Sequence, residues 1–252
     1  GFCLHLFQGL HDSRIKRWVK KSDAVEKFPD MEVGNFAYQR MSIYRDFSFP
    51  FLLPMARTIN LNGVYLGIDK LGHFFGFGRR YYQRYLRYLA EGGSEREAMA
   101  RVIRWGFWGE HFIVGGLVDG IIAYADLEAN YQGLRFALDL ASGASPRVVL
   151  DEGVWRRVRD IDIRGYVTPQ LDESYYNSSY TGLRQRQVLA ALREKYEDAE
   201  MPTAVKERFA RYGAVRPSFS CEVIAACLGE GSGNPQEAQS LENLRKSWGG
   251  VE

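Results

Sequence analysis

Six polar side chains that could take part in acid–base chemistry lie inside otherwise apolar, aromatic-rich segments near the middle of this chain. They are Asp69, Lys70, His73, Glu110, Asp126 and Asn130. A polar group in apolar surroundings is unfavourable unless it is paired. We therefore expect these six side chains to lie near one another, either as a paired structural cluster or as a functional site.

The spacing of these residues indicates how they could act together. Asp69 and His73 are four residues apart, as are Asp126 and Asn130, and residues four apart share one face of a helix. Glu110 lies among tryptophans and phenylalanines, which should raise its pKa and make it a general acid. Asp126 or Asp69 would be its ionised partner, and His73 would be an orienting group. Two carboxyl groups with different pKa values suit glycan hydrolysis.

Other interpretations of the same residues stay open. Asp126 could cap the N-terminus of a helix, Asn130 could close a buried hydrogen bond, and His73 could be a hydrogen-bonded core histidine. A divalent metal ion bound by Asp69, His73, Glu110 and Asp126 is a further alternative. For the hydrolase we expect no cofactor.

Further residues are candidates for binding a substrate. The segment LDESYYNSSY is expected to be a loop, where binding residues often lie, although a hydrogen-bonded turn is the simpler interpretation. The segment RRYYQRYLRYL places arginines on one helical face that could hold a phosphate, a lipid head group or an acidic glycan. A solvated basic face with inward tyrosines is the simpler interpretation there. The candidate substrate-binding residues are Asn130, Lys70, Trp108, Asp172, Glu173, Asn177, Arg80 and Arg84.

The elements that must position these residues are mainly helices. Apolar periodicity predicts a mainly α-helical fold with a helical-bundle core, a loop-rich C-terminal extension and no large sheet. We expect an N-terminal arm over 1–62, a core carrying the polar motif over 63–146, and a C-terminal region over 147–252 packed on the core. The helices expected in the core span 64–91, 95–113 and 126–142.

Local signals define several element ends. Gly92 and Gly93 should end the first core helix, and Ser94 with Glu97 is a capping box that starts the second. The C-terminal region should hold turns and short extended pieces first, because Asp, Asn, Ser, Gly and Pro are frequent there. Helices are then expected over 182–196, 203–212 and 220–228.

Composition narrows the class of protein. With 46% apolar and 14% aromatic residues, this chain of 252 residues should form a well-filled core. The formal net charge of +2, from 33 basic and 31 acidic residues, gives no reason to expect nucleic-acid binding. No uncharged apolar run is long enough to span a membrane.

The cysteines and the first residues bear on the cellular compartment. Cys3, Cys221 and Cys227 match neither a disulfide framework nor a zinc pattern. We interpret them as small buried apolar residues, with a bridge to Cys3 as the alternative. The chain begins like a cut end, from which a signal segment could have been removed.

The polar motif resembles a known family. The pattern D-K-x-x-H-F, a later Glu, then D-L-x-A-N-x-x-G is similar to the VanZ-like family and its relatives, the YfiM-like lipoproteins. The matching residues are Asp69, Lys70, His73, Phe74, Glu110, Asp126, Leu127, Ala129, Asn130 and Gly133. The resemblance covers roughly residues 64–140 and implies a helical protein of the bacterial envelope, often embedded in the membrane.

This chain departs from that family in lacking continuous transmembrane helices and in its long C-terminal region. We therefore expect a periplasmic or outer-membrane-associated hydrolase that acts on a cell-wall glycan, such as peptidoglycan, or on a lipid, with peripheral membrane contact and no nucleic-acid partner. The alternatives are a non-catalytic binding or scaffold protein at the membrane surface and a divalent-metal-dependent enzyme.

Overall fold

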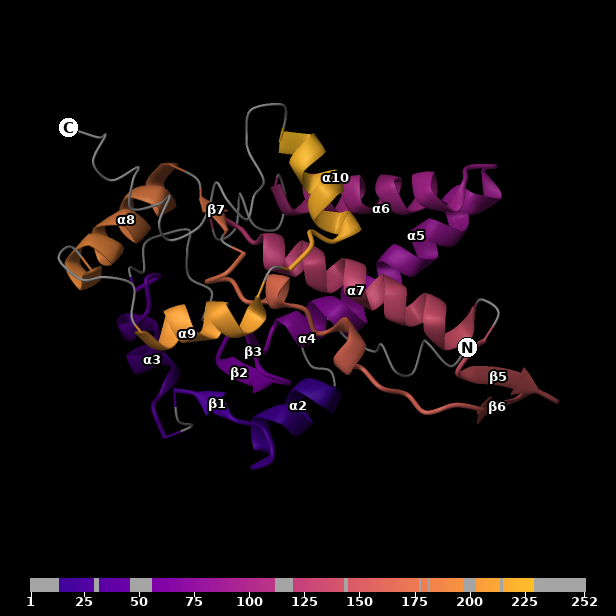
Figure 1. The fold of residues 1–252 in the computed structure, drawn as a ribbon, viewed down its shortest axis with the longest axis horizontal. Helices are drawn as coiled ribbons and strands as arrows, with labels where there is room; N and C mark the ends of the chain where they lie inside the picture. Colours follow the sequence, from indigo (N-terminus) through magenta and orange to yellow (C-terminus); the bar gives the residue numbers. More distant parts are fainter. Residues whose placement is uncertain are drawn as a thin grey trace.

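The structure is a computed structural model that describes residues 14–29, 32–45, 56–111, 120–142, 145–176, 178–180, 182–196, 203–213 and 215–228. It is mainly α-helical, as the apolar periodicity predicts, and its described strands are short (Figure 1). The longer helices are α2 (Arg14–Lys21), α3 (Asn35–Met41), α5 (Gly78–Ala90), α6 (Glu95–Gly109), α7 (Tyr124–Ala141), α8 (Gly182–Tyr196), α9 (Thr203–Tyr212) and α10 (Phe219–Leu228).

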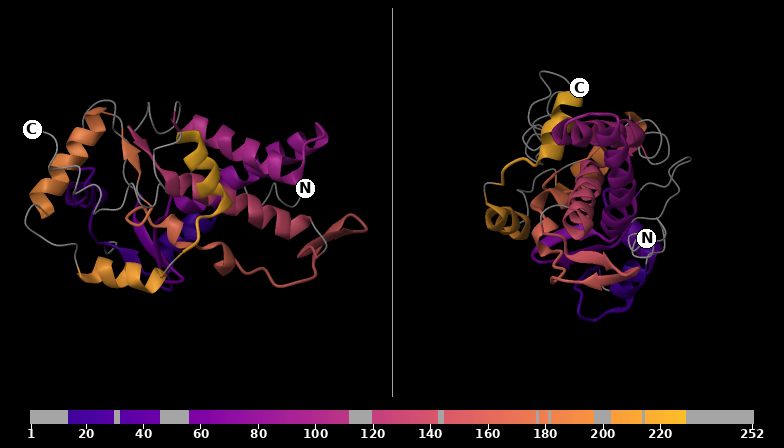
Figure 2. Two further views of the ribbon diagram at one scale, coloured as in Figure 1. Left: turned by 45° about the horizontal axis from the view of Figure 1, so that its top comes forward. Right: turned by 90° about the vertical axis from the view of Figure 1, so that its right-hand side faces the viewer.

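Helices α5, α6, α7 and α10 enclose the main hydrophobic core. Their inward faces contribute fully buried residues, among them Tyr81, Ile103, Leu134 and Ile224. Both views in Figure 2 show α5, α6 and α7 stacked beside one another. The helical bundle expected from the sequence is therefore confirmed, with α10 packed against it.

Local signals define α6 as expected. Gly92 has a positive φ of +91°, which suits the glycine that follows a helix. The Ser94 hydroxyl accepts a hydrogen bond from the backbone N–H of Glu97, and the Glu97 carboxylate accepts one from the backbone N–H of Ser94. This capping box satisfies two backbone donors at the start of α6.

Two glycines, Gly78 and Gly133, allow the backbone of α7 to pack directly against the backbone of η1 and α5. A Cβ atom on Gly133 would lie 2.0 Å from the carbonyl oxygen of Phe74 and 2.9 Å from the Cα atom of Gly78. A Cβ atom on Gly78 would lie 2.6 Å from the Cα atom of Gly133. Both positions therefore require glycine, and the close contact places His73 directly against α7.

The single helix expected over 64–91 is wrong at its N-terminal end. Strand β3 (Val64–Gly67) comes first, followed by the short helix α4 (Lys70–Gly72), the π-helical segment η1 (His73–Phe77) and α5. Residues 64–67 pair with β2 (Thr58–Leu61) through a turn at Asn62 and Gly63, both with positive φ. Four residues are too few to separate a helical from an alternating pattern, so the turn determines the strand.

The N-terminal region contributes a small antiparallel sheet beneath α7. Its strands are β1 (Lys27–Phe28), β2 and β3, in the order β1–β2–β3. Ile59 and Leu66, which face each other across β2 and β3, pack with Leu71 of α4 and Ala129 of α7. The boundary expected between residues 62 and 63 falls in the turn of this sheet. The remaining residues of the expected second helix, 112–113, lie outside the described residues.

The C-terminal region follows the expected order of turns and then helices. Strands β5 (Val148–Asp151) and β6 (Val154–Arg157) form a hairpin that projects from the end of the molecule opposite α8 (Figures 1 and 2). The 3-10 helices η3 (Arg164–Tyr166) and η4 (Pro169–Leu171) follow, and β7 (Ser179–Tyr180) pairs with β4 (Ile121–Ile122). The three helices expected after residue 181 are confirmed as α8, α9 and α10.

Two expectations about membranes and cysteines can be compared with the described residues. Among them, none of the helices combines the length and apolar character needed to cross a bilayer. Cys221 is a buried free thiol, as expected, whereas Cys227 is free but only partly buried. Cys3 lies outside the described residues.

Candidate functional site

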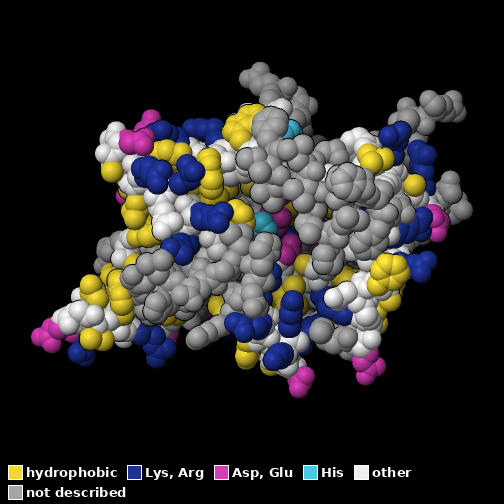
Figure 3. All heavy atoms as spheres, turned by 180° about the vertical axis from the view of Figure 1, so that it is seen from behind, with side chains coloured by type: hydrophobic (Ala, Val, Ile, Leu, Met, Phe, Trp, Pro, Cys, Tyr) yellow, Lys and Arg dark blue, Asp and Glu magenta, His cyan; other side chains and the backbone are white. Residues whose placement is uncertain are grey.

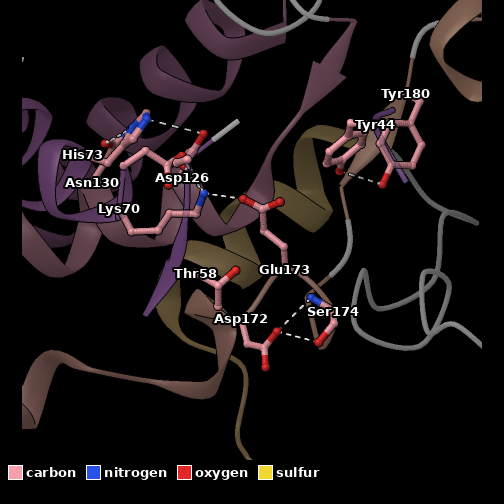
Figure 4. A network of polar contacts seen from close by, with 12 residues as sticks. Tyr44, Thr58, Lys70, His73, Asp126, Asn130, Asp172, Glu173, Ser174 and Tyr180 are labelled. Carbon is pink, nitrogen blue, oxygen red and sulfur yellow. Dashed lines mark hydrogen bonds and ion pairs between the residues drawn. The ribbon is translucent and has the colours of Figure 1, made fainter. Parts of the chain in front are cut away.

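The polar residues of the motif come together where α4, η1 and the start of α7 meet (Figure 4). At the centre lies the ammonium group of Lys70, whose side chain is only 1% exposed. It lies 2.7 Å from Asp126 Oδ1 and 3.1 Å from Asp69 Oδ2, and it is also paired with Glu173. One buried cation thus joins three carboxylates from three separate segments.

His73 lies beside this ion pair, and its two ring nitrogens contact different residues. Its Nδ1 atom is 3.1 Å from the side-chain oxygen of Asn130, which can only accept, so Nδ1 must carry a hydrogen. Its Nε2 atom lies 3.4 Å from Asp126 Oδ2. Asn130 in turn donates from Nδ2 to the hydroxyl of Tyr81, 3.5 Å away. These contacts orient the His73 ring.

Local backbone features hold this arrangement in place. His73 opens a five-residue π-helical segment, a rare conformation that is frequent at functional sites. The ring of His73 stacks on Phe77, with 5.1 Å between centroids. Gly106 of α6 leaves space for Tyr81, because a Cβ atom there would lie 1.6 Å from the Tyr81 hydroxyl oxygen.

Three carboxylates of the cluster, those of Asp69, Asp126 and Glu173, line a cavity of about 350 Å³. Lys70, His73 and Asn130 lie behind them and are not part of the described lining. Further lining residues come from α3, β2, β3, α8 and α9. The carboxylates in its lining are Asp69, Glu110, Asp126, Asp172 and Glu173, and the cations there are Arg184 and Arg208. The aromatic lining consists of Tyr38, Tyr44 and Tyr65. On the face shown in Figure 3, a histidine and acidic side chains lie together near the middle, with lysines and arginines around them.

The charges of the cluster shift the pKa values of its members. Burial alone would lower the pKa of Lys70, but Asp126, Asp69 and Glu173 outweigh this effect and raise it well above its ordinary value. Burial alone would raise the pKa of Asp69, but Lys70 and His73 outweigh this effect and lower it. Burial raises the pKa of Glu173, and Lys70 lowers it. The neighbouring carboxylates of Asp69 and Asp126 raise it further, so that the pKa of Glu173 lies above its ordinary value.

Other expected site residues divide into two groups. Glu110 lines the cavity and is 7% exposed, and Asp172 lines it while pairing with Arg208 at 3.2 Å. Trp108, by contrast, is 46% exposed and packs on Phe107 and His111. Arg80 lies over the ring of Phe77 and Arg84 over that of Trp105. Trp108, Arg80 and Arg84 are therefore not among the described residues that line the cavity. Asn177 lies outside the described residues.

The structure corrects two interpretations of α7. Asp126 is not the N-cap of this helix, because Ala123 occupies that position and Asp126 lies in the first turn. The four-residue spacing of Asp126 and Asn130 also does not join these two side chains in a hydrogen bond with each other. Instead, these two side chains contact different nitrogens of His73, which lies across from their shared helical face.

The segment that contains Asp172 forms a hydrogen-bonded turn, which is the simpler interpretation of its sequence. The backbone oxygen of Asp172 accepts hydrogen bonds from the N–H groups of Tyr175 and Tyr176, and its carboxylate accepts from the backbone N–H and the hydroxyl of Ser174. The segment is therefore a hydrogen-bonded turn, and that turn places Glu173 against Lys70.

Several residues of the site carry no signal in the sequence. Tyr81 occupies an apolar position of α5, and Arg184 and Arg208 lie on α8 and α9, whose sequences carry no polar motif. Outside the cavity, the buried carboxyl group of Glu128 accepts hydrogen bonds of 2.6 Å from Gln132 and from Ser218. Burial raises the pKa of Glu128, and it joins α7 to the segment before α10.

No family model, curated protein or solved structure matches this chain. The interpretation of the site therefore depends on its own geometry.

Proposed function

We propose that this protein is a hydrolase of the bacterial cell envelope that cleaves a cell-wall glycan, or else a lipid, in the cavity described above. The observation that supports this best is the orientation of His73. Asn130 holds its Nδ1–H group, and its Nε2 atom lies next to Asp126. Asp126 in turn lines a polar cavity together with Glu110. An oriented imidazole beside carboxyl groups is the arrangement that general acid–base catalysis requires.

In this proposal the polar groups of the site have different roles. The group formed by Asp69, His73 and Asp126 holds and activates a water molecule. That water attacks the scissile carbon and loses its proton to this group. Glu110 donates a proton to the oxygen of the leaving group as the bond to carbon breaks, so the overall reaction consumes one water molecule.

The lining of the cavity suits a polar substrate. Tyr38, Tyr44 and Tyr65 can pack on a sugar ring, and Arg184 and Arg208 can attract an anionic group such as a carboxylate or phosphate. A volume of about 350 Å³ lies at the small end of the range for ligand pockets, roughly 300–1,000 Å³. The site therefore suits a short part of a polymer or a head group.

The sequence supports a location in the envelope. The motif around Asp69, His73 and Asp126 resembles VanZ-like and YfiM-like proteins, which are envelope proteins. We therefore propose a periplasmic or outer-membrane-associated protein with peripheral contact to the membrane surface.

The test compares four purified proteins on peptidoglycan and on phospholipid vesicles. The parent should release products from one of these substrates, and Glu110→Gln and Asp126→Asn should each lose at least about a hundredfold in rate, a typical loss for a general acid or base. Asp139→Asn is the matched control, because Asp139 lies on the same helix as Asp126 but bonds to Tyr166 outside the cavity. Equal rates in all four folded proteins would contradict the assignment.

A binding or scaffold function at the membrane surface is the second candidate, favoured by the complete burial of Lys70 between three carboxylates. In this case the parent releases no product. Glu110→Gln should then lower the free energy of unfolding, whereas loss of a strained catalytic acid often leaves it unchanged or raises it.

A further inference from the structure

We propose that Asp69, His73 and Asp126 bind a divalent metal ion of the Mn²⁺ or Zn²⁺ type at the wall of the cavity. This inference deepens the proposed function and depends on it only for the role of the ion, because binding can be measured without any substrate.

The three side chains offer ligand atoms at suitable separations. One nitrogen of His73 and one carboxylate oxygen each from Asp69 and Asp126 lie within 4.8 Å of one another. Around a tetrahedral ion with bonds of about 2.1 Å, neighbouring ligand atoms are about 3.4 Å apart. The 3.4 Å between His73 Nε2 and Asp126 Oδ2 already matches this separation, and Asp69 would have to move closer by up to about 1.4 Å to complete the site.

The contacts of His73 call for a positive species beside Nε2. Because Nδ1 carries the hydrogen given to Asn130, a neutral ring has only a lone pair at Nε2. That lone pair faces Asp126 Oδ2 at 3.4 Å, and two acceptors repel each other at this distance. A proton or a metal ion between them removes the repulsion. A metal-binding histidine usually donates its second ring N–H to an oxygen acceptor such as a carboxylate or a backbone carbonyl, and the Asn130 side-chain oxygen is an acceptor of this kind.

The carboxylate oxygens divide between Lys70 and this position. Lys70 takes Oδ2 of Asp69 and Oδ1 of Asp126, which leaves the other oxygen of each group. Oδ2 of Asp126 is the atom near His73. Oδ1 of Asp69 is buried, and no residue that the structure describes donates a hydrogen bond to it. A buried acceptor without a donor is unfavourable, and a cation would satisfy it.

The charge of the cluster favours a divalent cation over a proton. Asp69, Asp126 and Glu173 surround the one ammonium group of Lys70, so negative charge exceeds positive charge. A proton on His73 offsets only part of this excess. Two carboxylates with one imidazole also suit Mn²⁺ and Zn²⁺ better than Ca²⁺ or Mg²⁺, which prefer oxygen ligands alone.

Such an ion would supply the activation of water. When bound, the ion would lower the pKa of a water molecule, so that hydroxide would be present near neutral pH and the released proton would pass to solvent. Asp69, His73 and Asp126 then act as ligands, Asn130 positions His73, and Glu110 keeps its role as the acid.

The first experiment measures Mn²⁺ and Zn²⁺ binding to EDTA-treated protein by calorimetry, with no substrate present. The parent and the control Asp139→Asn should bind one equivalent of the ion. His73→Gln and Asp126→Asn should lose at least tenfold in affinity. If either variant fails to fold by circular dichroism, Asp69→Glu takes its place, because it keeps the charge but displaces the carboxylate by one methylene group.

The second experiment follows the imidazole nitrogens by ¹⁵N NMR as Zn²⁺ is added. The Nε2 resonance of His73, identified by its absence in His73→Gln, should shift while Nδ1 keeps its hydrogen. The inference is wrong if the parent binds neither ion, if the variants bind as the parent does, or if the His73 resonances do not move.

The two proposals can fail separately. Hydrolysis at an unchanged rate in EDTA would contradict the metal site and leave the hydrolase in place. Binding of one ion by the parent, without product release from any tested substrate, would support the metal site and contradict the hydrolase.

Discussion

The Lys70 ammonium group determines whether three neighbouring carboxylates can stay buried together. In Lys70→Met these groups lose their shared counter-charge, and removing one partner of a buried ion pair typically costs about 3–5 kcal/mol. We expect a loss of this size in the free energy of unfolding at neutral pH, measured by urea denaturation in EDTA.

Lys20→Met is the matched control for this change, because Lys20 is exposed on α2. It should alter the free energy of unfolding by no more than about 0.5 kcal/mol. Saturating Mn²⁺ should restore part of the stability of Lys70→Met, since the ion replaces the lost charge. Equal stability of the two variants in EDTA would show that Lys70 does not hold the cluster together.

Asn130 is expected to act through His73 rather than on a substrate. Asn130→Ala removes the acceptor of the His73 Nδ1–H group, and loss of such a supporting contact typically lowers metal affinity by roughly 10–100-fold. Asn130→Asp keeps an oxygen in that place and should lose less. Calorimetry with Mn²⁺ on both variants tests this order, and the reverse order would remove Asn130 as a positioning residue.

At the scale of elements, the contact between α7 and the preceding helices depends on Gly133. In Gly133→Ala the new methyl group would meet the Phe74 carbonyl and Gly78 backbone, which cannot move aside as a side chain can. We expect a loss of about 3 kcal/mol in the free energy of unfolding, the upper part of the usual range for overpacking. Chemical denaturation measures this loss.

The matched control is Gly109→Ala, at the end of α6, where no described atom lies within 4 Å of the added Cβ. Alanine has the higher helix propensity, so this variant should be as stable as the parent or slightly more stable. If the two glycine variants are equally stable, the close approach of α7 and η1 is not tight in solution.

The strength of local signals explains which elements could be predicted from the sequence. Helix α6 has a capping box and a long periodic face, so its start and its type were predictable. Strand β3 has only four residues, and its pairing with β2 depends on a turn that apolar spacing does not reveal. Gly133 belongs to the polar motif, but its close contact with Phe74 and Gly78 depends on how whole helices pack.

At the scale of the whole molecule, the part of the site on the central helices was more predictable than the rest. Asp69 and His73 lie at the starts of α4 and η1, and Asp126 lies in the first turn of α7. Each is a polar residue within apolar sequence, which indicated that they meet. Arg184 and Arg208 reach the same cavity from helices more than fifty residues further along the chain. Their approach depends on long-range packing, which local patterns do not encode.

The buried tyrosines of the molecule give it a common response to alkaline pH. Burial raises the pKa of Tyr180 to about 12, and burial together with Asp139 raises that of Tyr166 to about 12, from 10.0. Burial also raises the pKa values of Tyr44, Tyr81, Tyr176 and Tyr212. Between pH 10 and 12 the unfolded chain therefore loses protons that the folded protein keeps, so the free energy of unfolding must fall as pH rises.

Below pH 10 these tyrosines are protonated in both states, and they should leave the free energy of unfolding unchanged. Urea denaturation at a series of pH values should show this fall only above pH 10. Tyrosinate absorbance near 295 nm should rise in two steps, first from exposed tyrosines and then together with loss of the circular dichroism signal. If all fifteen tyrosines ionise in one reversible step near pH 10 while the helical signal persists, the packing of Tyr44, Tyr81 and Tyr176 is looser than described. In that case the cavity wall formed by Tyr44 would also be open to solvent, and the site would lose the enclosed surroundings that the proposed chemistry needs.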